Sequence, residues 1–483
     1  MRSKRQAEVD FFPQIERSSH LSLERQIVRA VREAIVCGRL RPGMRLPSSR
    51  RLAAQLHVNR NTIVNALAQL IAEEYLTGKP GSGTFVSQQI QISPKPSQHP
   101  SLDARWLRPL SPPHVFPPRK DLLEFRVCQP STNAFPLVQW RKAWHQALQH
   151  LPLDDYSPPA GERGLRAAIA EYLARARGLI CSPEDVIITN GAIQGIHLVT
   201  AATVTPGECV AFEEPGYPLA RQVFEYHGAQ ILPIAVDEDG LRVEALPERQ
   251  ASPLLVYVTP SHQFPLGVRM SATRRLALLD WAVRNDALII EDDYDSEFRY
   301  DAPPLPPLAS LDSHDRVVYV GTFSKVLFPG LRIGYVIAAA PLRERLEHLK
   351  CLMDYHTNIP TQRSIECFMK EGYFDQHISR MRRLYAEKRS VLEKVLLPLK
   401  PVASFRGLEA GLHTFIEFDA SVQIDALIQT CLASGILITD VAQYYLADPN
   451  RRGLVLGYGG LELPDIEWAG LQLMSSVQLG SHR

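Results

Sequence analysis

Cysteine is scarce and scattered in this sequence of 483 residues, and its pattern argues against two kinds of cysteine-dependent structure. No Cys-x-x-Cys pair and no compact cluster of cysteine and histidine occurs. We therefore expect neither a disulfide framework nor a metal site, and we interpret the thiols as free and mostly buried. The seven cysteines are Cys37, Cys128, Cys181, Cys209, Cys351, Cys367 and Cys431.

A long apolar run and a strong net charge are also missing. No hydrophobic stretch is long enough to span a bilayer, and the first residues do not resemble a secretory signal, so we expect a cytoplasmic protein without a membrane partner. The formal net charge is +1, but residues 21–88 carry ten Lys and Arg against four Asp and Glu. A basic segment on a mildly acidic body suggests that this segment alone binds a polyanion.

The chain is longer than one hydrophobic core usually organises, which predicts at least two domains. Between residues 93 and 118, eight of 26 residues are proline, and such a stretch continues neither a helix nor a central strand. We therefore predict an N-terminal domain over residues 16–88, a proline-rich linker over 89–120 and a large domain over 121–483.

Apolar residues at helical spacing predict three helices in the N-terminal domain. The first helix ends at Gly38, the second is capped by Ser48 or Ser49, and the third follows a turn at residues 57–59. A glycine-rich tip at residues 78–83 lies between two short apolar runs and predicts a β-wing. The expected core positions are Leu23, Ile27, Val31, Ile35, Leu52, Ala53, Leu56, Ile63, Leu67, Leu70 and Ile71.

The third helix leaves polar side chains on its outer N-terminal face, the end from which a recognition helix reads base edges in the major groove. Arg60, Asn61 and Asn65 have the donors and acceptors for base contacts. Phosphate contacts are expected from Arg45, Arg50, Arg51 and Lys79. The alternative is a three-helix bundle whose polar face is only solvated.

The segment GRLRPGMRLPSSRRLAAQLHVNRNTIVNAL, together with the wing GSGTFV, resembles the GntR-type winged helix-turn-helix. This resemblance implies that double-stranded DNA is the partner. It also implies contacts from Arg45, Ser48, Arg50, Arg60, Asn61, Thr62 and the wing residues Lys79 to Gly83, Gly81 included.

Beyond the linker, short apolar runs alternate with helical patterns. Continuous apolar strands predict a parallel sheet that is covered by helices on both faces. Each run ends in a polar or glycine-containing segment, and ligands of open α/β sheets bind at the carboxyl ends of the strands. The runs are Val186–Thr189, Cys209–Phe212, Leu254–Val258, Ala287–Ile290 and Val317–Val320.

These strand ends offer the groups that pyridoxal 5′-phosphate needs. Lys325 supplies an amine, Asp292 a carboxylate for the ring nitrogen, and Tyr294 a hydroxyl for the ring oxygen. Tyr217 is the candidate stacking ring, and His262 is expected near the ring hydroxyl. The phosphate group would meet Thr322, Ser324, Arg332 and the turn Asn190-Gly191-Ala192, which opens a helix.

The motifs TNGAIQGI, EEPGYP, TPSHQFPLG, IIEDDYDSEF and TFSKVLFPGLRIGY resemble the fold type I aminotransferase domain of MocR-like regulators. The resemblance implies a multidomain protein: a winged helix-turn-helix followed by an α/β, pyridoxal phosphate-dependent transferase-like domain. It implies that Lys325 forms the internal aldimine, with Asp292, Tyr294, Gly191, Ala192, Thr322, Ser324 and Arg332 binding the cofactor. It also implies a homodimer, in which Tyr156 reaches the partner's cofactor.

Two positions depart from the family pattern. Ser157-Pro158 follows Tyr156 where a glycine is usual. True aminotransferases place an arginine for the substrate carboxylate near the C-terminus, whereas the equivalent stretch here is Gly453-Leu454-Val455-Leu456-Gly457, with Arg451 and Arg452 just before it. Binding of an amino acid, and its turnover, are therefore less strongly indicated than binding of the cofactor.

Three functions follow from these patterns. The first is a transcription regulator that senses the cofactor, or an amino compound, through an aldimine on Lys325. The second is a working aminotransferase that carries a DNA-binding domain. The third is a DNA-binding protein whose large domain only dimerises.

Overall fold

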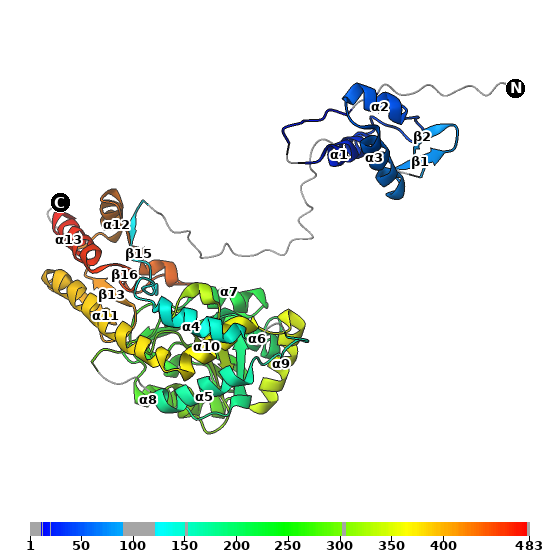
Figure 1. Ribbon diagram of the computed structural model, residues 1–483. Helices are drawn as coiled ribbons and strands as arrows, with labels where there is room; N and C mark the ends of the chain where they lie inside the picture. Colours follow the sequence, from blue (N-terminus) through cyan, green and yellow to red (C-terminus); the bar gives the residue numbers. More distant parts are fainter. Residues whose placement is uncertain are drawn as a thin grey trace. The chain divides into compact units, whose positions relative to one another are not determined.

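The computed structural model describes residues 11, 13–19, 21–89, 121–149, 153–301 and 306–480. The chain divides into two compact units, within residues 1–109 and 110–483 (Figure 1). Almost all of the predicted proline-rich linker lies outside the described residues. No helix in the described ranges combines the length and the apolar character that crossing a membrane would need.

The N-terminal unit consists of three helices and one antiparallel hairpin, as the periodicity predicts. The helices are α1 (Leu23–Val36), α2 (Ser49–Leu56) and α3 (Arg60–Ala72), and the hairpin pairs β1 (Leu76–Lys79) with β2 (Gly83–Val86). Each helix has a polar N-cap, because Ser22, Ser48 and Asn59 accept hydrogen bonds from amides of the first turn.

Most of the predicted core residues of this unit are buried or packed against the core, but Leu23 is only half-buried and Ile71 is exposed. Ile63, Ala66 and Leu70 of α3 are fully buried, whereas Ile71 is 38% exposed. The predicted inward position of Ile71 is therefore wrong. Ile71 is four residues after the buried Leu67, but it lies in the last turn of α3, which ends at Ala72, and the core does not cover it fully there.

The large unit is organised around an eight-stranded sheet with the order β4-β11-β10-β9-β8-β5-β6-β7. All five predicted strands are present, and three of them extend further at their carboxyl ends. The prediction of a parallel sheet needs correction, because β11 is antiparallel to both of its neighbours and β7 is antiparallel to β6. The strands are β4 (Val186–Thr189), β5 (Cys209–Glu214), β6 (Gln230–Asp237), β7 (Gly240–Leu241), β8 (Leu255–Val258), β9 (Leu288–Asp293), β10 (Val317–Thr322) and β11 (Gly334–Ile337).

Helices cover both faces of this sheet, as predicted. Successive side chains of a strand point to opposite faces. Ile290 accordingly packs in the cluster that includes residues of α6 (Ala192–Thr203), α7 (Pro218–Tyr226) and α9 (Ala340–Asp354). Ile289 packs in a cluster with α8 (Ala272–Arg284). A third cluster, on strands β4, β10 and β11, includes residues of α4 (Leu137–Leu148), α5 (Arg163–Arg177) and α10 (Ile359–Lys370).

A smaller C-terminal lobe is built on an antiparallel sheet with the order β12-β13-β16-β15. A separate two-stranded parallel sheet joins this lobe to the start of the large unit. In it, β3 (Leu123–Glu124) pairs with β14 (Ile436–Leu437). The segment at the start of the large unit therefore lies against its last hundred residues. The other elements are α11 (Tyr373–Leu396), β12 (Ala403–Arg406), β13 (His413–Phe418), α12 (Ile424–Ala433), β15 (Thr439–Asp440), β16 (Gly453–Gly457) and α13 (Leu463–Gly480).

Candidate functional site

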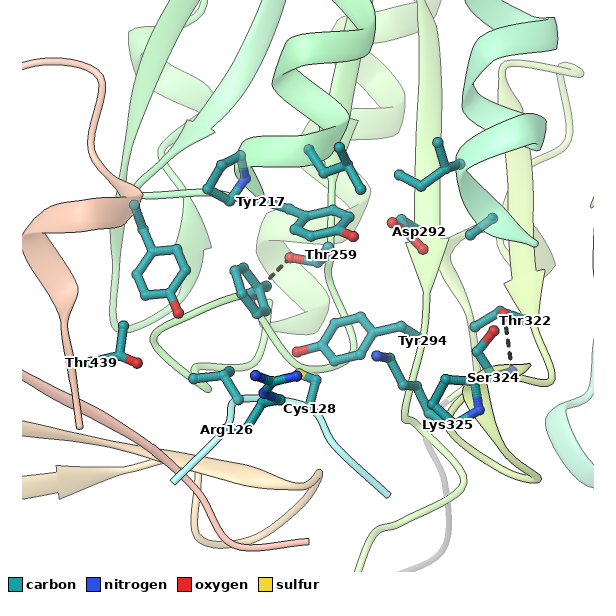
Figure 2. A pocket seen from close by; sticks show the side chains of 18 of the residues that line it. Arg126, Cys128, Tyr217, Thr259, Asp292, Tyr294, Thr322, Ser324, Lys325 and Thr439 are labelled. Atoms are coloured by element: carbon teal, nitrogen blue, oxygen red, sulfur yellow. Dashed lines mark hydrogen bonds between the residues drawn. The ribbon is translucent and has the colours of Figure 1, made fainter. Parts of the chain in front are cut away.

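A cavity of about 430 Å³ lies at the carboxyl ends of the central strands, where the strand pattern places a ligand (Figure 2). Eight of the predicted cofactor residues line it, although they come from five separate segments of the chain. These eight are Ala192, Tyr217, Asp292, Tyr294, Thr322, Ser324, Lys325 and Arg332. Gly191, His262 and Tyr156 lie outside its lining.

The carboxyl group of Asp292 is buried, and one of its two oxygens already accepts a hydrogen bond. Its Oδ2 accepts a hydrogen bond from the Tyr257 hydroxyl at 2.6 Å. Its Oδ1 is buried without a hydrogen-bond partner among the described residues. Burial raises the pKa of this carboxyl to about 6, although Tyr257 and Lys325 act in the other direction. A buried acceptor without a partner is costly, so the site is suited to a ligand that donates a hydrogen bond to Oδ1.

The neighbouring carboxyl group, that of Asp293, points into a different environment. Its Oδ2 pairs with the Arg177 guanidinium at 2.9 Å and accepts a hydrogen bond from the Tyr319 hydroxyl at 2.7 Å. Both partners of the ion pair are almost fully buried. Because successive side chains of β9 alternate between faces, one carboxylate is neutralised in the core while Asp292 faces the cavity.

The opposite end of the cavity is suited to an anion. Gly191 is the N-cap of α6, with a φ of 85° that favours glycine, and a Cβ there would meet Arg332 Nη2 at 2.9 Å. Arg332 Nη2 also donates to the Asn190 carbonyl at 2.9 Å. Thr322 and Ser324 bring two hydroxyl groups to the same end (Figure 2). A helix N-terminus, a guanidinium group and hydroxyl groups together form a phosphate-binding environment.

Partly buried polar contacts hold the turn that carries Gly191. Asp354 Oδ2 accepts hydrogen bonds from Asn190 Nδ2 at 2.5 Å and from Gln194 Nε2 at 2.6 Å. The Lys350 ammonium, which is fully buried, donates to Asp354 Oδ1 at 2.8 Å. The C-terminal end of α9 therefore stabilises the N-terminal turn of α6 through these hydrogen bonds.

Lys325 lies just beyond β10, and its side chain points into the cavity toward Tyr294 (Figure 2). Tyr217 is placed at the N-terminus of α7, where its ring contacts that of Phe264 with centroids 5.3 Å apart. A primary amine, a carboxylate and an aromatic ring, each from a different strand end, thus face one cavity.

His262 is not among the residues that line this cavity, and its expected place near the ring hydroxyl stays a prediction. Its Nδ1 pairs with Asp295 Oδ2 at 3.0 Å, and its main-chain carbonyl accepts a hydrogen bond from the Tyr294 hydroxyl at 2.8 Å. Burial lowers the pKa of this imidazole, but the Asp295 and Glu409 carboxylates and a hydrogen bond to the Gly407 backbone together outweigh burial, and the net shift of the pKa is upward. His262 therefore positions the Tyr294 hydroxyl through its main-chain carbonyl.

A cluster of Cys128, Asp295 and His413 lies beside this pair, with ligand atoms within 4.8 Å of one another. Hydrogen bonding accounts for the cluster without an ion. Cys128 Sγ contacts His413 Nδ1 at 3.4 Å, Asp295 pairs with His262, and His413 Nε2 contacts the Pro265 carbonyl at 3.1 Å.

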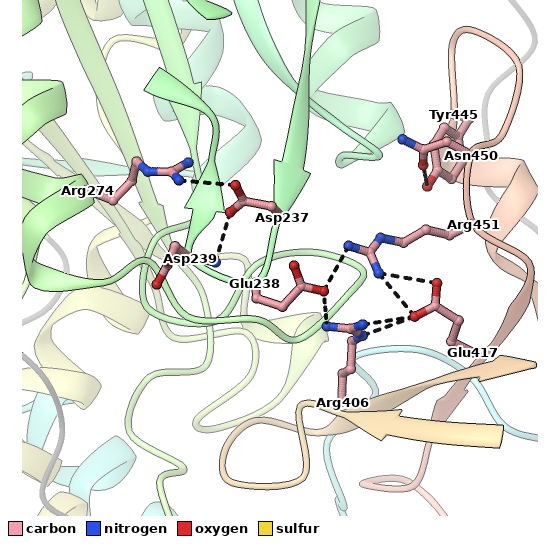
Figure 3. A network of polar contacts seen from close by, with 9 residues as sticks. All are labelled: Asp237, Glu238, Asp239, Arg274, Arg406, Glu417, Tyr445, Asn450 and Arg451. Atoms are coloured by element: carbon pink, nitrogen blue, oxygen red, sulfur yellow. Dashed lines mark hydrogen bonds and ion pairs between the residues drawn. The ribbon is translucent and has the colours of Figure 1, made fainter. Parts of the chain in front are cut away.

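Arg451 and Arg452, the C-terminal arginines nearest to the expected carboxylate-binding position, also lie outside the cavity lining. Arg451 bridges Glu417 at 3.0 Å and Glu238 at 3.3 Å (Figure 3). Arg452 Nη2 donates to the Val422 carbonyl at 3.3 Å. The first of these arginines is used in an ionic network between the C-terminal lobe and the turn after β6.

Tyr156 lies outside the cavity on an exposed surface. Its side chain is 70% exposed, and its ring contacts that of Tyr355 with centroids 4.6 Å apart. Leu352 and Met353, at the end of α9, are 74% and 50% exposed. This part of the large unit therefore presents apolar and aromatic side chains to its surroundings.

The sequence patterns did not indicate several residues of the cavity. Glu124, Arg126 and Cys128 come from the segment beginning at β3, and Thr439, Gln443 and Tyr444 come from the C-terminal lobe. No local motif marks these residues, because only the pairing of β3 with β14 brings the start of the large unit to its end.

In the N-terminal unit, the predicted DNA-contacting residues differ in exposure. Arg50, Arg60, Asn61, Lys79 and Gly81 are exposed, whereas Arg45 and Thr62 are half-buried. Ser48 is exposed, but its hydroxyl caps α2 by accepting from the Arg51 amide at 3.3 Å. Val64 was not predicted as a contact, although it is 42% exposed and one turn beyond Arg60 on α3. An exposed valine there suits a thymine methyl group.

Comparison with known proteins agrees with both units. Residues 120–453 match the family model described as aminotransferase class I and II, and residues 23–86 match the bacterial regulatory proteins of the gntR family. The chain is 38% identical to the uncharacterized HTH-type transcriptional regulator YdeL of Bacillus subtilis, over 95% of this chain and 97% of that protein. It is 35% identical to the HTH-type pyridoxine biosynthesis transcriptional regulator PdxR of Corynebacterium glutamicum, over 95% and 97%.

A third relative is the probable rhizopine catabolism regulatory protein MocR of Rhizobium meliloti, 34% identical over 93% of this chain and 92% of that protein. Among solved structures, the α-aminoadipate aminotransferase LysN of Thermus thermophilus, complexed with N-(5′-phosphopyridoxyl)-L-leucine, is 27% identical. It has a TM-score of 0.68 and covers 75% of this chain and 93% of its own. The chain therefore belongs to the MocR-like regulators of the gntR family, in which a winged helix-turn-helix precedes a fold type I aminotransferase domain.

Proposed function

We propose that this transcription regulator binds pyridoxal 5′-phosphate in the cavity and that Lys325 supplies the amine that holds it. The observation that carries the proposal is the buried, unpaired Oδ1 of Asp292, which faces the same cavity as Lys325 and the anion-binding end. When bound, the cofactor supplies an aldehyde that condenses with primary amines and a ring nitrogen that carries a proton.

The other residues have roles set by their positions. Asp292 would accept a hydrogen bond from the protonated ring nitrogen, and Tyr217 would cover one face of the ring. Tyr294 lies at the ring oxygen, held by the His262 carbonyl. Ala192, Thr322, Ser324 and Arg332 of the cavity lining would form the phosphate cup, together with Gly191, which lies beside Arg332.

Absorbance spectroscopy of the purified full-length protein tests this proposal. Titration with pyridoxal 5′-phosphate is expected to produce a saturable band at the edge of the visible range that reduction with borohydride fixes to the protein. Peptide mapping should then find the modification on Lys325. A spectrum that remains the sum of free cofactor and protein would instead favour a large unit that only dimerises.

An effector with a primary amine would act at the same position. The effector's amine would compete with Lys325 for the aldehyde of the bound cofactor, and Lys325 Nζ would then return to a free amine. Only an effector that binds two conformations differently can change DNA binding. The name of the Corynebacterium relative, a regulator of pyridoxine biosynthesis, supports a response to the cofactor itself.

Catalysis of transamination is not the favoured function. The relatives that match nearly the whole chain are named as transcription regulators. Arg451 and Arg452 also point to partners outside the cavity. Steady turnover of an amino acid with an oxo acid would be needed to support an enzymatic role.

The DNA partner also supports the predicted cytoplasmic location.

We propose that the exposed face of α3 reads bases and that the wing contacts phosphates. Replacing Arg60 with alanine should cost about 1–3 kcal/mol on duplexes that the wild type selects from a randomised pool, and much less on unrelated duplexes. Replacing Lys79 with alanine should weaken binding to all duplexes equally and reduce the slope of log K against log salt by about one. Fluorescence anisotropy of labelled duplexes over a salt series measures both.

Arg29, which is exposed on α1 and paired with Glu33, gives the matched control. Arg29→Ala should leave both the sequence preference and the salt dependence unchanged. Equal losses from Arg60→Ala on selected and unrelated duplexes would rule out a base-reading role for Arg60.

We further propose a homodimer that uses the surface around Tyr156, Leu352 and Met353. The exposed apolar area there supports a protein interface.

Replacing Leu352 with aspartate should shift the protein toward monomers, because the interface would then bury an unpaired charge. Analytical ultracentrifugation at several concentrations measures the shift. Leu471, 44% exposed on α13, provides the control as Leu471→Asp. A wild type that sediments as a monomer at every concentration would exclude this dimer.

A further inference from the structure

A short segment before α1 is fixed against the core of the N-terminal unit. Phe11 and Ile15 are partly buried and pack against the apolar core that α1, α2 and α3 share. Pro13 is buried as well. The match to the gntR family begins at residue 23, so this segment lies outside the part of the chain that the family describes. The match therefore assigns no role to it.

Hydrogen bonds from α1 also hold this segment. Gln26 Oε1 accepts a hydrogen bond from the Glu16 amide at 2.8 Å, and Gln26 Nε2 donates to the Glu16 carbonyl at 3.0 Å. The same nitrogen donates to the Leu21 carbonyl at 2.8 Å. Because both main-chain polar groups of Glu16 are held, the next residue, Arg17, starts from a defined position.

Arg17 brings a guanidinium group to the turn between α2 and α3. Its Nη2 donates to the carbonyl of His57, the C-cap of α2, at 2.8 Å. Arg17 is exposed, and no acidic side chain forms an ion pair with it in the ranges that the structure describes. The adjacent Glu16 carboxylate instead accepts a hydrogen bond from the Ser18 hydroxyl at 3.0 Å. The charge of Arg17 is therefore available to a partner outside the unit.

The contact with His57 places this guanidinium beside the surface that we propose for DNA. Asn59 is the N-cap of α3, and the proposed base-reading residues Arg60 and Asn61 begin its first turn. A recognition helix enters the major groove with this end, so the residues just before it lie near the phosphates that border the groove. Arginine binds phosphate oxygens through charge-assisted hydrogen bonds.

We infer that Arg17 binds a DNA phosphate beside the major groove that α3 enters. The contact extends the DNA-binding surface to a segment before α1, and it adds affinity without reading a base. The inference rests on the proposed base reading by α3, because the turn at His57 lies at the DNA only if the start of α3 does. The alternative is that Arg17 only caps the last carbonyls of α2.

Three substitutions at Arg17 distinguish a phosphate contact from capping. Arg17→Ala should weaken binding about fivefold at about 150 mM salt, by a similar factor on selected and unrelated duplexes, and reduce the slope of log K against log salt by about one. Arg17→Gln keeps an N–H donor for the His57 carbonyl but loses the charge, and should weaken binding as much as alanine does. Arg17→Lys keeps the charge, and should retain most of the affinity and of the salt dependence.

A scan of single phosphates locates the contact. The full-length protein is titrated with labelled duplexes of the selected sequence in which one phosphate at a time is replaced by a neutral methylphosphonate. We expect at least one replacement to weaken binding of the wild type but not of Arg17→Ala, because that variant has already lost the contact. Arg29→Ala, which removes an exposed arginine of α1, is the matched control and should respond like the wild type at every position.

The outcomes separate this inference from base reading by α3. Wild-type affinity in Arg17→Gln, or identical phosphate scans of the wild type and Arg17→Ala, would overturn the inference and leave base reading standing. A loss that differs between selected and unrelated duplexes would overturn it as well. If Arg17→Ala melts at a lower temperature than the wild type, the comparison of Arg17→Gln with Arg17→Lys provides the test. A wild type that selects no sequence from the randomised pool would overturn both proposals.

Discussion

Replacing Lys325 with alanine is expected to abolish the visible absorbance band and to raise the apparent dissociation constant of pyridoxal 5′-phosphate by at least about a hundredfold. The physical reason is the loss of the covalent bond, which the phosphate cup and Asp292 replace only in part. One hundredfold corresponds to about 2.7 kcal/mol. Equilibrium dialysis with absorbance detection measures the loss, and Lys394→Ala, exposed on α11, is the control.

The same variant distinguishes the function of the large unit from DNA binding by the N-terminal unit. Lys325 lies in the unit within residues 110–483, whereas the proposed DNA contacts lie within residues 1–109. DNA binding by Lys325→Ala without cofactor should therefore match that of the wild type without cofactor. A reporter gene that responds to the cofactor in the wild type should no longer respond. Identical reporter output from both proteins would show that the cofactor does not regulate transcription.

Replacing Asp292 with asparagine is expected to have opposite effects on the free and the loaded protein. Burial raises the pKa of Asp292 from 3.8 to about 6, so the folded protein binds more protons than the unfolded chain between these pH values. The free energy of unfolding therefore falls as pH rises through this window, and the cost is fully present above it. Asparagine carries no charge and removes this cost. The cofactor-free variant should therefore melt at a higher temperature than the cofactor-free wild type at pH 8.

With the cofactor bound, the order should reverse. The ionised carboxylate of Asp292 stabilises a proton on the ring nitrogen, and asparagine does so far less. We expect the affinity of Asp292→Asn for the cofactor to fall about tenfold to a hundredfold at pH 8. In the wild type, affinity should decrease as pH falls below about 6, where Asp292 becomes protonated. Comparison of the two proteins over the same pH series isolates this carboxyl from the cofactor's own phosphate.

Differential scanning fluorimetry with and without cofactor provides the measurement for both halves of this prediction. Asp286→Asn provides the control, because its carboxyl is 87% exposed in an ion pair with Arg316. A variant that melts below the wild type in both the free and loaded states would show that Asp292 has a structural role instead. The difference in sign therefore distinguishes a cofactor partner from a residue that merely supports the fold.

Much of the site could be predicted because its residues lie at strand ends and helix starts. There, a local sequence pattern also indicates where a side chain lies in the folded protein. An apolar run followed by Asp292 or by Lys325 already indicates which edge of the sheet each side chain occupies. The strands β4, β5, β8, β9 and β10 therefore appear where the sequence predicts them. In the same way, polar caps and 3.6-residue spacing located α1, α2 and α3.

Only the tertiary structure decided which distant groups meet. His262 was predicted near the cofactor from its motif, but the motif did not indicate that its ring pairs with the buried Asp295 carboxylate. Arg451 lies close in sequence to the expected position of a ligand-binding arginine, but Glu417 and Glu238 bind it elsewhere. Arg126 has no recognisable motif, yet the pairing of β3 with β14 brings it to the cavity.

The sequence by itself determined the two domain types, the element order and the residues at the carboxyl ends of the strands. Periodicity, capping and strand ends are local properties, so they can be read within windows of ten to twenty residues. The tertiary structure alone decided the antiparallel insertion of β11, the partners of the buried charges and the place of Arg126 in the cavity lining. The pairing of β11 with β4 and the ion pair of Arg177 with Asp293 join segments more than one hundred residues apart, and no local pattern encodes such contacts.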